Sequence, residues 1–237
     1  MHSLFLREVS IDWDAVSDYT QHIAALHSFD RLAFQKQITF FTGENGSGKS
    51  TLLEAIAVAY GFNPEGGTKN YRFYTKDTHS SLHEGIHLSR GFCQPSCSYF
   101  LRAESFYNLA TKAEEYASIY QGRELHSCSH GESFLSFIQS FRDIGLFLLD
   151  EPEAALSPQR QLTLLIQLST MAWEGSQFLI ATNSPILLGI PGAEIWTFDD
   201  GPIHSCRYED TDSYQVTEMF INSREYLLKR LLDESGE

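Results

Sequence analysis

Short apolar runs alternate along this chain with longer segments in which apolar residues recur at helical spacing. The short runs predict strands, most of them buried in a parallel sheet: Leu4 to Ile11, Gln37 to Thr42, Ser98 to Ala103, Leu146 to Leu149 and Phe178 to Ala181. The longer segments predict helices: Leu52 to Tyr60, Glu104 to Tyr120, Glu132 to Phe141, the residues after Ser157-Pro158 and about Ser213 to Leu232. Strands that alternate with helices predict an α/β fold, a mostly parallel sheet with flanking helices.

Three stretches depart from this alternation. Residues 12–30 predict a polar connection with a short amphipathic piece, and residues 195–208 predict two strands around the turn Asp199-Asp200-Gly201-Pro202. Residues 61–97 are rich in Gly, Asn, Thr, Ser and His without a sustained period, which predicts an exposed insertion with short strands. In the helix after Ser157, the residues expected to face the core are Leu162, Leu165, Ile166 and Leu168.

The length of 237 residues and the absence of a Pro/Ser-rich linker predict a single domain. Hydrophobic residues make up 42% of the chain and aromatic residues 13%, which indicates a packed globule rather than a disordered chain. We expect a nucleotide-binding core in residues 1–60 and 145–208, a helical and β insertion lobe in residues 61–144, and C-terminal helices in residues 211–233.

Composition excludes several classes of protein. No apolar run approaches the roughly 18 residues of a membrane helix, and the N-terminus lacks the pattern of a signal peptide, so a cytoplasmic location is predicted. The net charge of −14 disfavours a broad cationic surface for nucleic acid. The four cysteines form no C-x-x-C framework and the histidines do not cluster with them at zinc-finger spacing, so reduced thiols are predicted.

One stretch carries a specific chemical signal, because it satisfies G-x-x-x-x-G-K-[ST] between a predicted strand and a predicted helix. Consecutive backbone N–H groups and the helix dipole would then point at one place, where polyphosphate oxygens can bind. Lys49 would reach the β- and γ-phosphates, and Ser50 would hold Mg²⁺. The predicted nucleotide-binding residues are Gly43, Glu44, Asn45, Gly46, Ser47, Gly48, Lys49, Ser50 and Thr51.

A buried strand that ends in two acids supplies the groups that hydrolysis needs in addition to phosphate binding. Asp150 and Glu151 follow four apolar residues, and in a parallel sheet this end would lie beside the phosphate-binding loop. Asp150 would hold Mg²⁺, and Glu151 would accept hydrogen bonds from the attacking water.

The stretch Ser129-His130-Gly131-Glu132 has two compatible interpretations. It fits a capping box, with Ser129 at the N-cap and Glu132 at the third helical position. It also fits a second phosphate site, because a Ser hydroxyl and a Gly N–H at a helix N-terminus can bind anions.

In their order along the chain, these motifs resemble those of ABC-type ATPases. The resemblance rests on Gly43 to Ser50, Ser129 to Glu132, Leu146 to Glu151, Ala154 to Ser157 and Ala181 to Pro185. Within this family, the chain most resembles the soluble, bacterial "AAA family" ATPases, which are related to SMC and DNA-repair ATPases. The reason is that the chain has Ser-His-Gly-Glu where transporters have Ser-Gly-Gly-Gln.

The resemblance implies a head-to-tail dimer in which Ser129, His130, Gly131 and Glu132 of one subunit close over ATP bound to the other. It implies a dimer-interface loop at Ala155, Leu156 and Ser157, and a metal- or water-contacting role for Glu104. It also implies a phosphate-sensing residue at Asn183, where related ATPases commonly have His. Asn can donate a hydrogen bond to a γ-phosphate but is never charged, and it is equally suited to a turn before Ser-Pro.

These observations predict an enzyme that binds ATP and Mg²⁺, hydrolyses ATP, dimerises on ATP binding and drives a conformational change in a protein partner of unknown identity. Asn183 supports an alternative, an ATP-gated switch that hydrolyses slowly or not at all. A DNA-associated, SMC-like role follows from the resemblance alone, and the net charge of −14 weakens it. GTP is disfavoured because no [NT]-K-x-D stretch is present.

Overall fold

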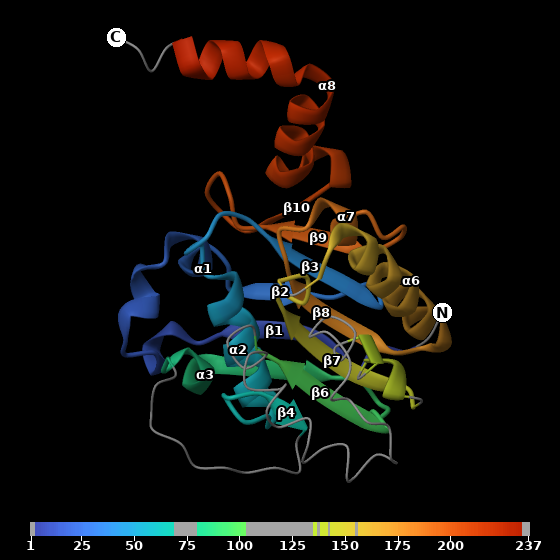
Figure 1. The fold of residues 1–237 in the computed structure, drawn as a ribbon. Coiled ribbons are helices and arrows are strands. Elements are labelled where there is room, and N and C mark those ends of the chain that lie inside the picture. Colours follow the sequence, from blue (N-terminus) through green and yellow to red (C-terminus); the bar gives the residue numbers. More distant parts are fainter. Residues whose placement is uncertain are drawn as a thin grey trace.

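The computed structural model describes residues 3–68, 80–102, 135–136, 138–141, 143–154 and 156–233. Its centre is a seven-stranded sheet (Figure 1) with the order β10 (His204–Cys206), β9 (Glu194–Thr197), β3 (Ile38–Thr42), β8 (Gln177–Ala181), β7 (Gly145–Asp150), β6 (Cys97–Leu101) and β4 (Gly67–Thr68). The strands from β9 to β6 are parallel, and β10 and β4 add antiparallel edges. The loops after β9, β3, β8, β7 and β6 therefore emerge at one edge of the sheet.

A smaller antiparallel sheet covers one side of the structure, with the order β2 (Arg31–Ala33), β1 (Leu6–Ile11) and β5 (Ile86–Arg90). Helix α2 (Lys49–Tyr60) packs between this sheet and the large one. Its Leu52, Leu53 and Ile56 share a hydrophobic core with residues of β1 and with one face of the large sheet, and Gly61 caps the helix in the left-handed conformation.

A second hydrophobic core lies on the other face of the large sheet, beneath α6 (Pro158–Glu174) and α7 (Pro185–Leu188). Neighbouring residues of a strand point to opposite faces, so Phe41 belongs to the first core and Phe40 to the second. Both faces of β3, β7 and β8 are thus buried, which explains why these strands are largely apolar.

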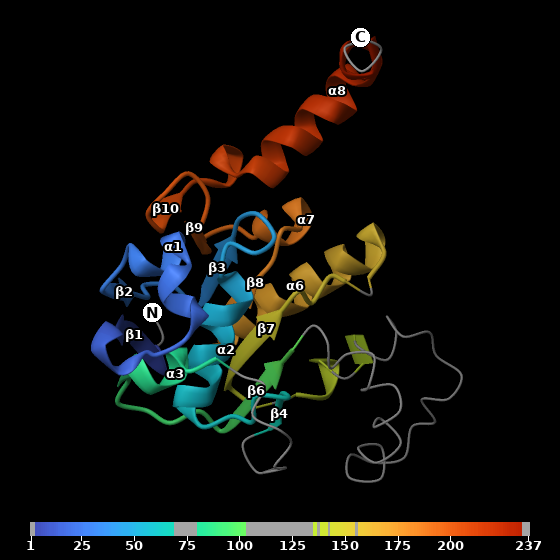
Figure 2. The ribbon, with the colours of Figure 1, turned by 90° about the vertical axis from the view of Figure 1, so that its left-hand side faces the viewer.

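The remaining elements are short except for one. They are η1 (Trp13–Ala15), η2 (Tyr19–His22), α1 (Ala24–His27), α3 (Leu82–Gly85) and η5 (Tyr208–Asp210). Helix α8 (Asp212–Asp233) is a 22-residue helix that projects from the body of the protein, as Figure 2 shows, and its backbone is non-helical at Ser223.

The predicted fold class is confirmed, and the strand after residue 4, the α2 helix and the hairpin at β9 and β10 lie where the sequence predicted them. For the described part of residues 61–97, the predicted short strands are confirmed by β4 and β5, but the prediction that they form an exposed insertion is wrong. Within it, β5 pairs with β1, and Leu82 and Ile86 are buried in the first core. Strand β6 likewise lies inside the large sheet, next to β7, and not in a separate lobe.

The predicted core face of α6 also needs correction. Leu162 and Ile166 are 51% and 65% exposed, whereas Leu164 and Leu168 are fully buried. Residues two positions apart on a helix point about 200° apart, so a face centred on Leu164 turns both neighbours outward.

Several predictions fall outside the described residues: the helix at 104–120, Glu104, the Ser129 to Glu132 motif and Ala155. Within the helix predicted at 132–141, residues 135–136 and 138–140 are helical, and Leu135 and Ile138 are buried. Among the residues that the structure describes, no helix is long and apolar enough to cross a membrane.

Candidate functional site

Four loops meet at the carboxyl edge of the large sheet, after β3, β7, β8 and β9. Register places them together, because β3 lies between β8 and β9 and β8 lies beside β7. The predicted phosphate-binding loop, the acid pair and Asn183 occupy the first three of these loops. The structure thus brings together residues that lie more than a hundred positions apart in the chain.

The loop after β3 depends on its glycines. Gly43, Gly46 and Gly48 have φ angles of 142°, 84° and 102°, which disfavour residues with a Cβ. A Cβ at Gly43 would lie 2.9 Å from an Asp199 carboxylate oxygen, and one at Gly48 would lie 2.9 Å from Ile23. Conformation and close packing therefore both require glycine at the two ends of this loop.

Lys49 begins α2, and its side chain folds back beneath the loop. Its ammonium donates hydrogen bonds to the carbonyl oxygens of Gly43 and Glu44, the latter at 2.8 Å. Burial lowers the pKa of Lys49, while the nearby carboxylates, Asp199 first among them, oppose that shift. A cation held by two backbone carbonyl oxygens of the loop is suited to neutralising bound phosphate oxygens.

The next residue joins α2 to the acidic end of β7. The Ser50 hydroxyl donates a hydrogen bond of 2.7 Å to the Asp150 carboxylate, and Asp150 is buried. Mg²⁺ prefers oxygen ligands and commonly takes only one or two from the protein, with water and phosphate completing its shell. The adjacent Ser50 and Asp150 oxygens fit that requirement, although no cluster of three His, Cys, Asp or Glu suited to a metal occurs among the described residues.

Glu151 has an unusual backbone. Its φ of 46° lies in the left-handed region, which is uncommon for a residue other than glycine. The Glu151 N–H donates to the Ala181 carbonyl at 2.9 Å, and the Glu151 carbonyl accepts from Ala154 at 3.0 Å. The chain therefore turns away from the end of the sheet at Glu151, and this residue is exposed.

Glu153 is a site residue that the sequence analysis missed. One of its carboxylate oxygens accepts hydrogen bonds from the Thr182 hydroxyl and from the Asn183 N–H, the latter at 3.3 Å. The other oxygen is buried and has no hydrogen-bond partner. Burial raises the pKa of Glu153, with the nearby Glu151 charge adding to the shift. Glu153 thus ties the loop after β7 to the loop after β8.

Asn183 lies against the beginning of the phosphate-binding loop. Its side-chain oxygen accepts hydrogen bonds from the Gly43 N–H at 3.2 Å and from the Thr42 hydroxyl at 3.3 Å. Ser184 then caps α7 by accepting a hydrogen bond from Leu187, which fits the Ser-Pro turn that the sequence suggested. The amide of Asn183 is therefore positioned by the loop itself.

Asp199, in the turn between β9 and β10, is the second residue that the sequence analysis missed. Its carboxylate accepts a hydrogen bond of 2.7 Å from the Glu44 N–H. Asp199 and Asn183 together fix the two consecutive N–H groups of Gly43 and Glu44.

Only part of the predicted interface loop, residues 155–157, lies on the surface. Leu156 is buried in the second core, so its side chain contributes to packing rather than to a contact surface. Ser157 is exposed and caps α6 by accepting a hydrogen bond from the Arg160 N–H at 3.4 Å. Ala155, Glu104 and the Ser129, His130, Gly131 and Glu132 motif lie outside the described residues.

Residues 20–122 match the profile of a family described as an AAA domain. This part of the chain is similar to AAA domains. The match agrees with the resemblance that the motifs carry, and the matched range includes the complete predicted phosphate-binding loop from Gly43 to Thr51. A search of curated proteins found no significant relative of this chain.

Three solved structures show a distant similarity to this chain. An ABC transporter described as of the metal-chelate type, in an inward-facing conformation, is 17% identical over 92% of this chain and 88% of its own, with a TM-score of 0.48. The SMC head domain from Thermotoga maritima is 12% identical over 86% and 98%, with a TM-score of 0.47. The ADP conformation of an ATP-binding cassette of an ABC transporter is 17% identical over 92% and 98%, with a TM-score of 0.45. Similarities at this level do not identify a function.

Proposed function

We propose that this protein binds and hydrolyses ATP, that ATP brings two copies together head to tail, and that this closure changes the conformation of a protein partner. The observation that carries the proposal is the meeting of Ser50 and Asp150 at 2.7 Å beside the buried Lys49. A phosphate-binding helix and an acidic strand end are thereby joined at one point.

Each residue has a chemical task in this proposal. Backbone N–H groups of the loop and Lys49 bind the β- and γ-phosphates, and Ser50 and Asp150 hold Mg²⁺. When bound, the ion neutralises charge that develops on the phosphate oxygens. Glu151 orients a water molecule by accepting its hydrogen bonds.

The exposure of Glu151 supports the head-to-tail arrangement. An acid that must act on water away from bulk solvent needs a cover, and Glu151 is exposed in the single chain. In this proposal a second copy provides the cover through Ser129 to Glu132, with Ser157 near the contact.

The test compares Glu151→Gln with Glu174→Gln, which changes an exposed acid at the far end of α6. Glu151→Gln should bind ATP with unchanged affinity and release phosphate at least about a hundredfold more slowly, and an increase in mass on adding ATP should persist. Glu174→Gln should behave as the wild type. Unchanged phosphate release from Glu151→Gln would refute the assignment of this acid.

A second candidate, a slowly hydrolysing ATP-gated switch, is favoured by the contacts of Asn183. Its side-chain oxygen is already engaged by Gly43 and Thr42, and an amide cannot carry a positive charge. Asn183→His should raise the rate of phosphate release if this residue limits it. An unchanged or lower rate in the variant would argue against the switch.

A further inference from the structure

Helix α8 presents large apolar side chains to solvent. All residues from 215 to 226 are exposed, which is unusual for a helix that carries so many apolar groups. The helix leaves the body of the protein along most of its length (Figure 2), and its main contacts are with α7 and η5 at its base. The exposed apolar residues are Val216, Met219, Phe220, Ile221, Tyr226, Leu231 and Leu232.

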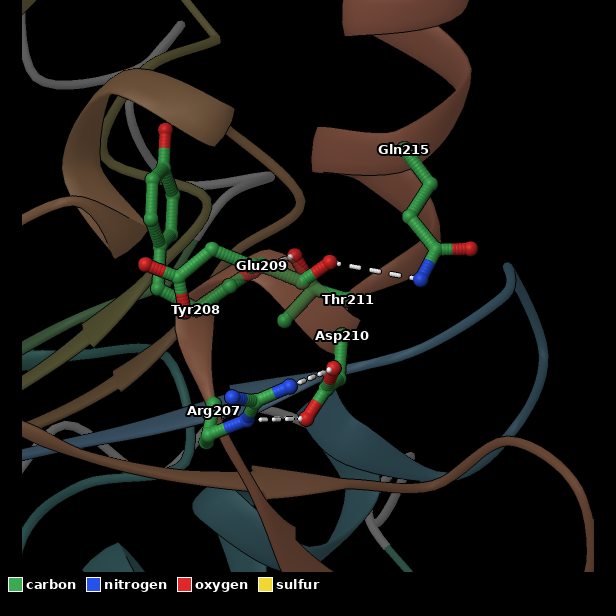
Figure 3. Close-up of polar contacts among 6 residues, drawn as sticks. All are labelled: Arg207, Tyr208, Glu209, Asp210, Thr211 and Gln215. Carbon is green, nitrogen blue, oxygen red and sulfur yellow. Dashed lines mark hydrogen bonds and ion pairs between the residues drawn. The ribbon is translucent and has the colours of Figure 1, made fainter.

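The base of α8 is fixed by a network of hydrogen bonds (Figure 3). The Tyr208 hydroxyl donates to the Pro185 carbonyl, outside the view of the figure, at 2.8 Å. The Thr211 hydroxyl donates to the Tyr208 carbonyl at 2.7 Å. The Gln215 amide donates to the Glu209 carbonyl at 3.2 Å. The projecting direction of α8 is therefore set by specific contacts.

Most large apolar residues of α8 are arranged symmetrically about the point between Ser223 and Arg224, where the helix is also interrupted. The exceptions are Tyr214 and Leu232, whose counterparts are Asp233 and Gln215. Four apolar residues before this point each have an apolar counterpart at the same distance after it. The matched residues are Val216 and Leu231, Met219 and Leu228, Phe220 and Leu227, and Ile221 and Tyr226.

Such a pattern is what an interface between two identical helices requires. In a two-fold symmetric contact, residue i of one copy meets residue j of the other and residue j meets residue i. An antiparallel pair centred between Ser223 and Arg224 brings Phe220 beside the Leu227 of the second copy, and Val216 beside its Leu231. We propose that α8 associates with the α8 of a second copy of this chain, each half of one helix packing antiparallel on the other half of its partner.

Charge favours the same arrangement. The first half of α8, residues 212–222, carries two acids, Asp212 and Glu218, and no base. The second half, residues 223–233, carries three bases, Arg224, Lys229 and Arg230, against two acids. Antiparallel packing places the acidic half against the basic half and opposes the two helix dipoles, whereas parallel packing places acid beside acid.

The proposed interface between the two α8 helices is small, so we expect a weak association. Each half spans about three helical turns, or roughly 16 Å, so the interface lies at the low end of the size range of specific complexes. The pairing therefore has a dissociation constant on the order of micromolar. It requires no nucleotide and is independent of the ATP chemistry proposed above.

The test is sedimentation velocity from about 1 to 200 μM without nucleotide, on a Lys49→Ala background that weakens nucleotide binding. The parent should show a reversible monomer–dimer equilibrium. Phe220→Glu should weaken the association at least about tenfold, because it places a charge opposite an apolar residue. Thr217→Glu adds the same charge to an exposed polar position of the same helix, opposite Arg230 of the second copy in this register, and should not weaken the association.

A mixing experiment tests the register itself. Phe220→Glu and Leu227→Lys should each dimerise poorly alone. An equimolar mixture should associate again, since the heterodimer contains one Glu–Lys pair and one native Phe–Leu pair. A parent that stays monomeric at about 200 μM, equal weakening by Phe220→Glu and Thr217→Glu, or a mixture that fails to associate would each overturn the proposal. Circular dichroism of every variant verifies that the loss of association does not arise from unfolding.

Discussion

One buried side chain joins the two sheets, and its removal is expected to weaken the whole fold. Gln177 is fully buried at the amino end of β8. Its oxygen accepts hydrogen bonds from the Phe5 and Leu6 N–H groups at 2.8 and 2.9 Å, and its amide donates to the Leu6 carbonyl at 2.7 Å. Leucine is similar in volume and has no polar atom, so Gln177→Leu removes three hydrogen bonds at once.

The size of the effect follows from these three contacts. A buried polar group left without a partner costs about 1–3 kcal/mol, and local adjustment reduces the sum, so we expect a loss of about 4 kcal/mol. For a chain of this length that corresponds to a fall in Tm of roughly 12 °C. Gln37→Leu is the control, because the Gln37 amide donates a single hydrogen bond of 2.9 Å to the Gly175 carbonyl. Its loss should be about 1 kcal/mol, or roughly 3 °C.

Thermal unfolding followed by circular dichroism measures both variants, and nucleotide affinity is measured well below Tm. The site lies at the opposite, carboxyl end of β8, so folded Gln177→Leu should bind nucleotide as the wild type does. Our reasoning is refuted if Gln177→Leu loses no more stability than Gln37→Leu, or if it loses nucleotide affinity while fully folded.

Three further predictions concern the site and the base of α8. Gly43→Ala should weaken nucleotide binding at least about tenfold, because its Cβ would lie 2.9 Å from a carboxylate oxygen. Gly192→Ala, which has a φ of 79° but open space around the Cβ, should leave binding unchanged. The pKa of Glu153 is raised above 4.5 by burial, so the folded protein holds a proton that the unfolded chain releases, and stability falls as pH rises through the raised pKa. Glu153→Gln should therefore raise Tm by a few degrees at pH 8 and by less at pH 5, as measured by calorimetry; an equal gain at both values would contradict this. Tyr208→Phe loses the part-buried hydrogen bond of its hydroxyl and should lower Tm by roughly 3 °C, whereas Tyr214→Phe, whose hydroxyl bond is exposed, should leave Tm unchanged.

The sequence was sufficient for features that depend on neighbouring residues. The glycines, Lys49 and Ser50 occupy fixed offsets between a strand and a helix, and Asp150 follows an apolar run, so local pattern located them. Their proximity also followed, because loops after parallel strands emerge at one edge of a sheet.

The contacts of Asp199 and Glu153 depend instead on the order of the strands. Asp199 reaches the Glu44 N–H because β9 pairs with β3. The sequence of the turn around Asp199 does not reveal that strand pairing. Glu153 reaches Thr182 because β7 pairs with β8. Strand order is set by packing of the whole domain, which local patterns do not encode.

The predictions for residues 61–97 and for the core face of α6 were wrong for a related reason. Residues 61–97 are mostly polar, and the few apolar residues among them did not form a recognisable pattern. Two of these, Leu82 and Ile86, are buried in the first hydrophobic core. In α6, apolar residues occur on both sides of the helix, so the spacing alone did not determine which side faces the sheet.

The left-handed backbone of Glu151 bears on how this site can change in the course of evolution. That conformation costs roughly 1–2 kcal/mol for a residue with a Cβ, and glycine would relieve it. Replacement of Glu151 by glycine is thus favoured by folding and opposed only by the water-orienting role proposed for the acid. In descendants of this chain that no longer hydrolyse nucleotide, the carboxylate should disappear early, while the buried strand before it persists.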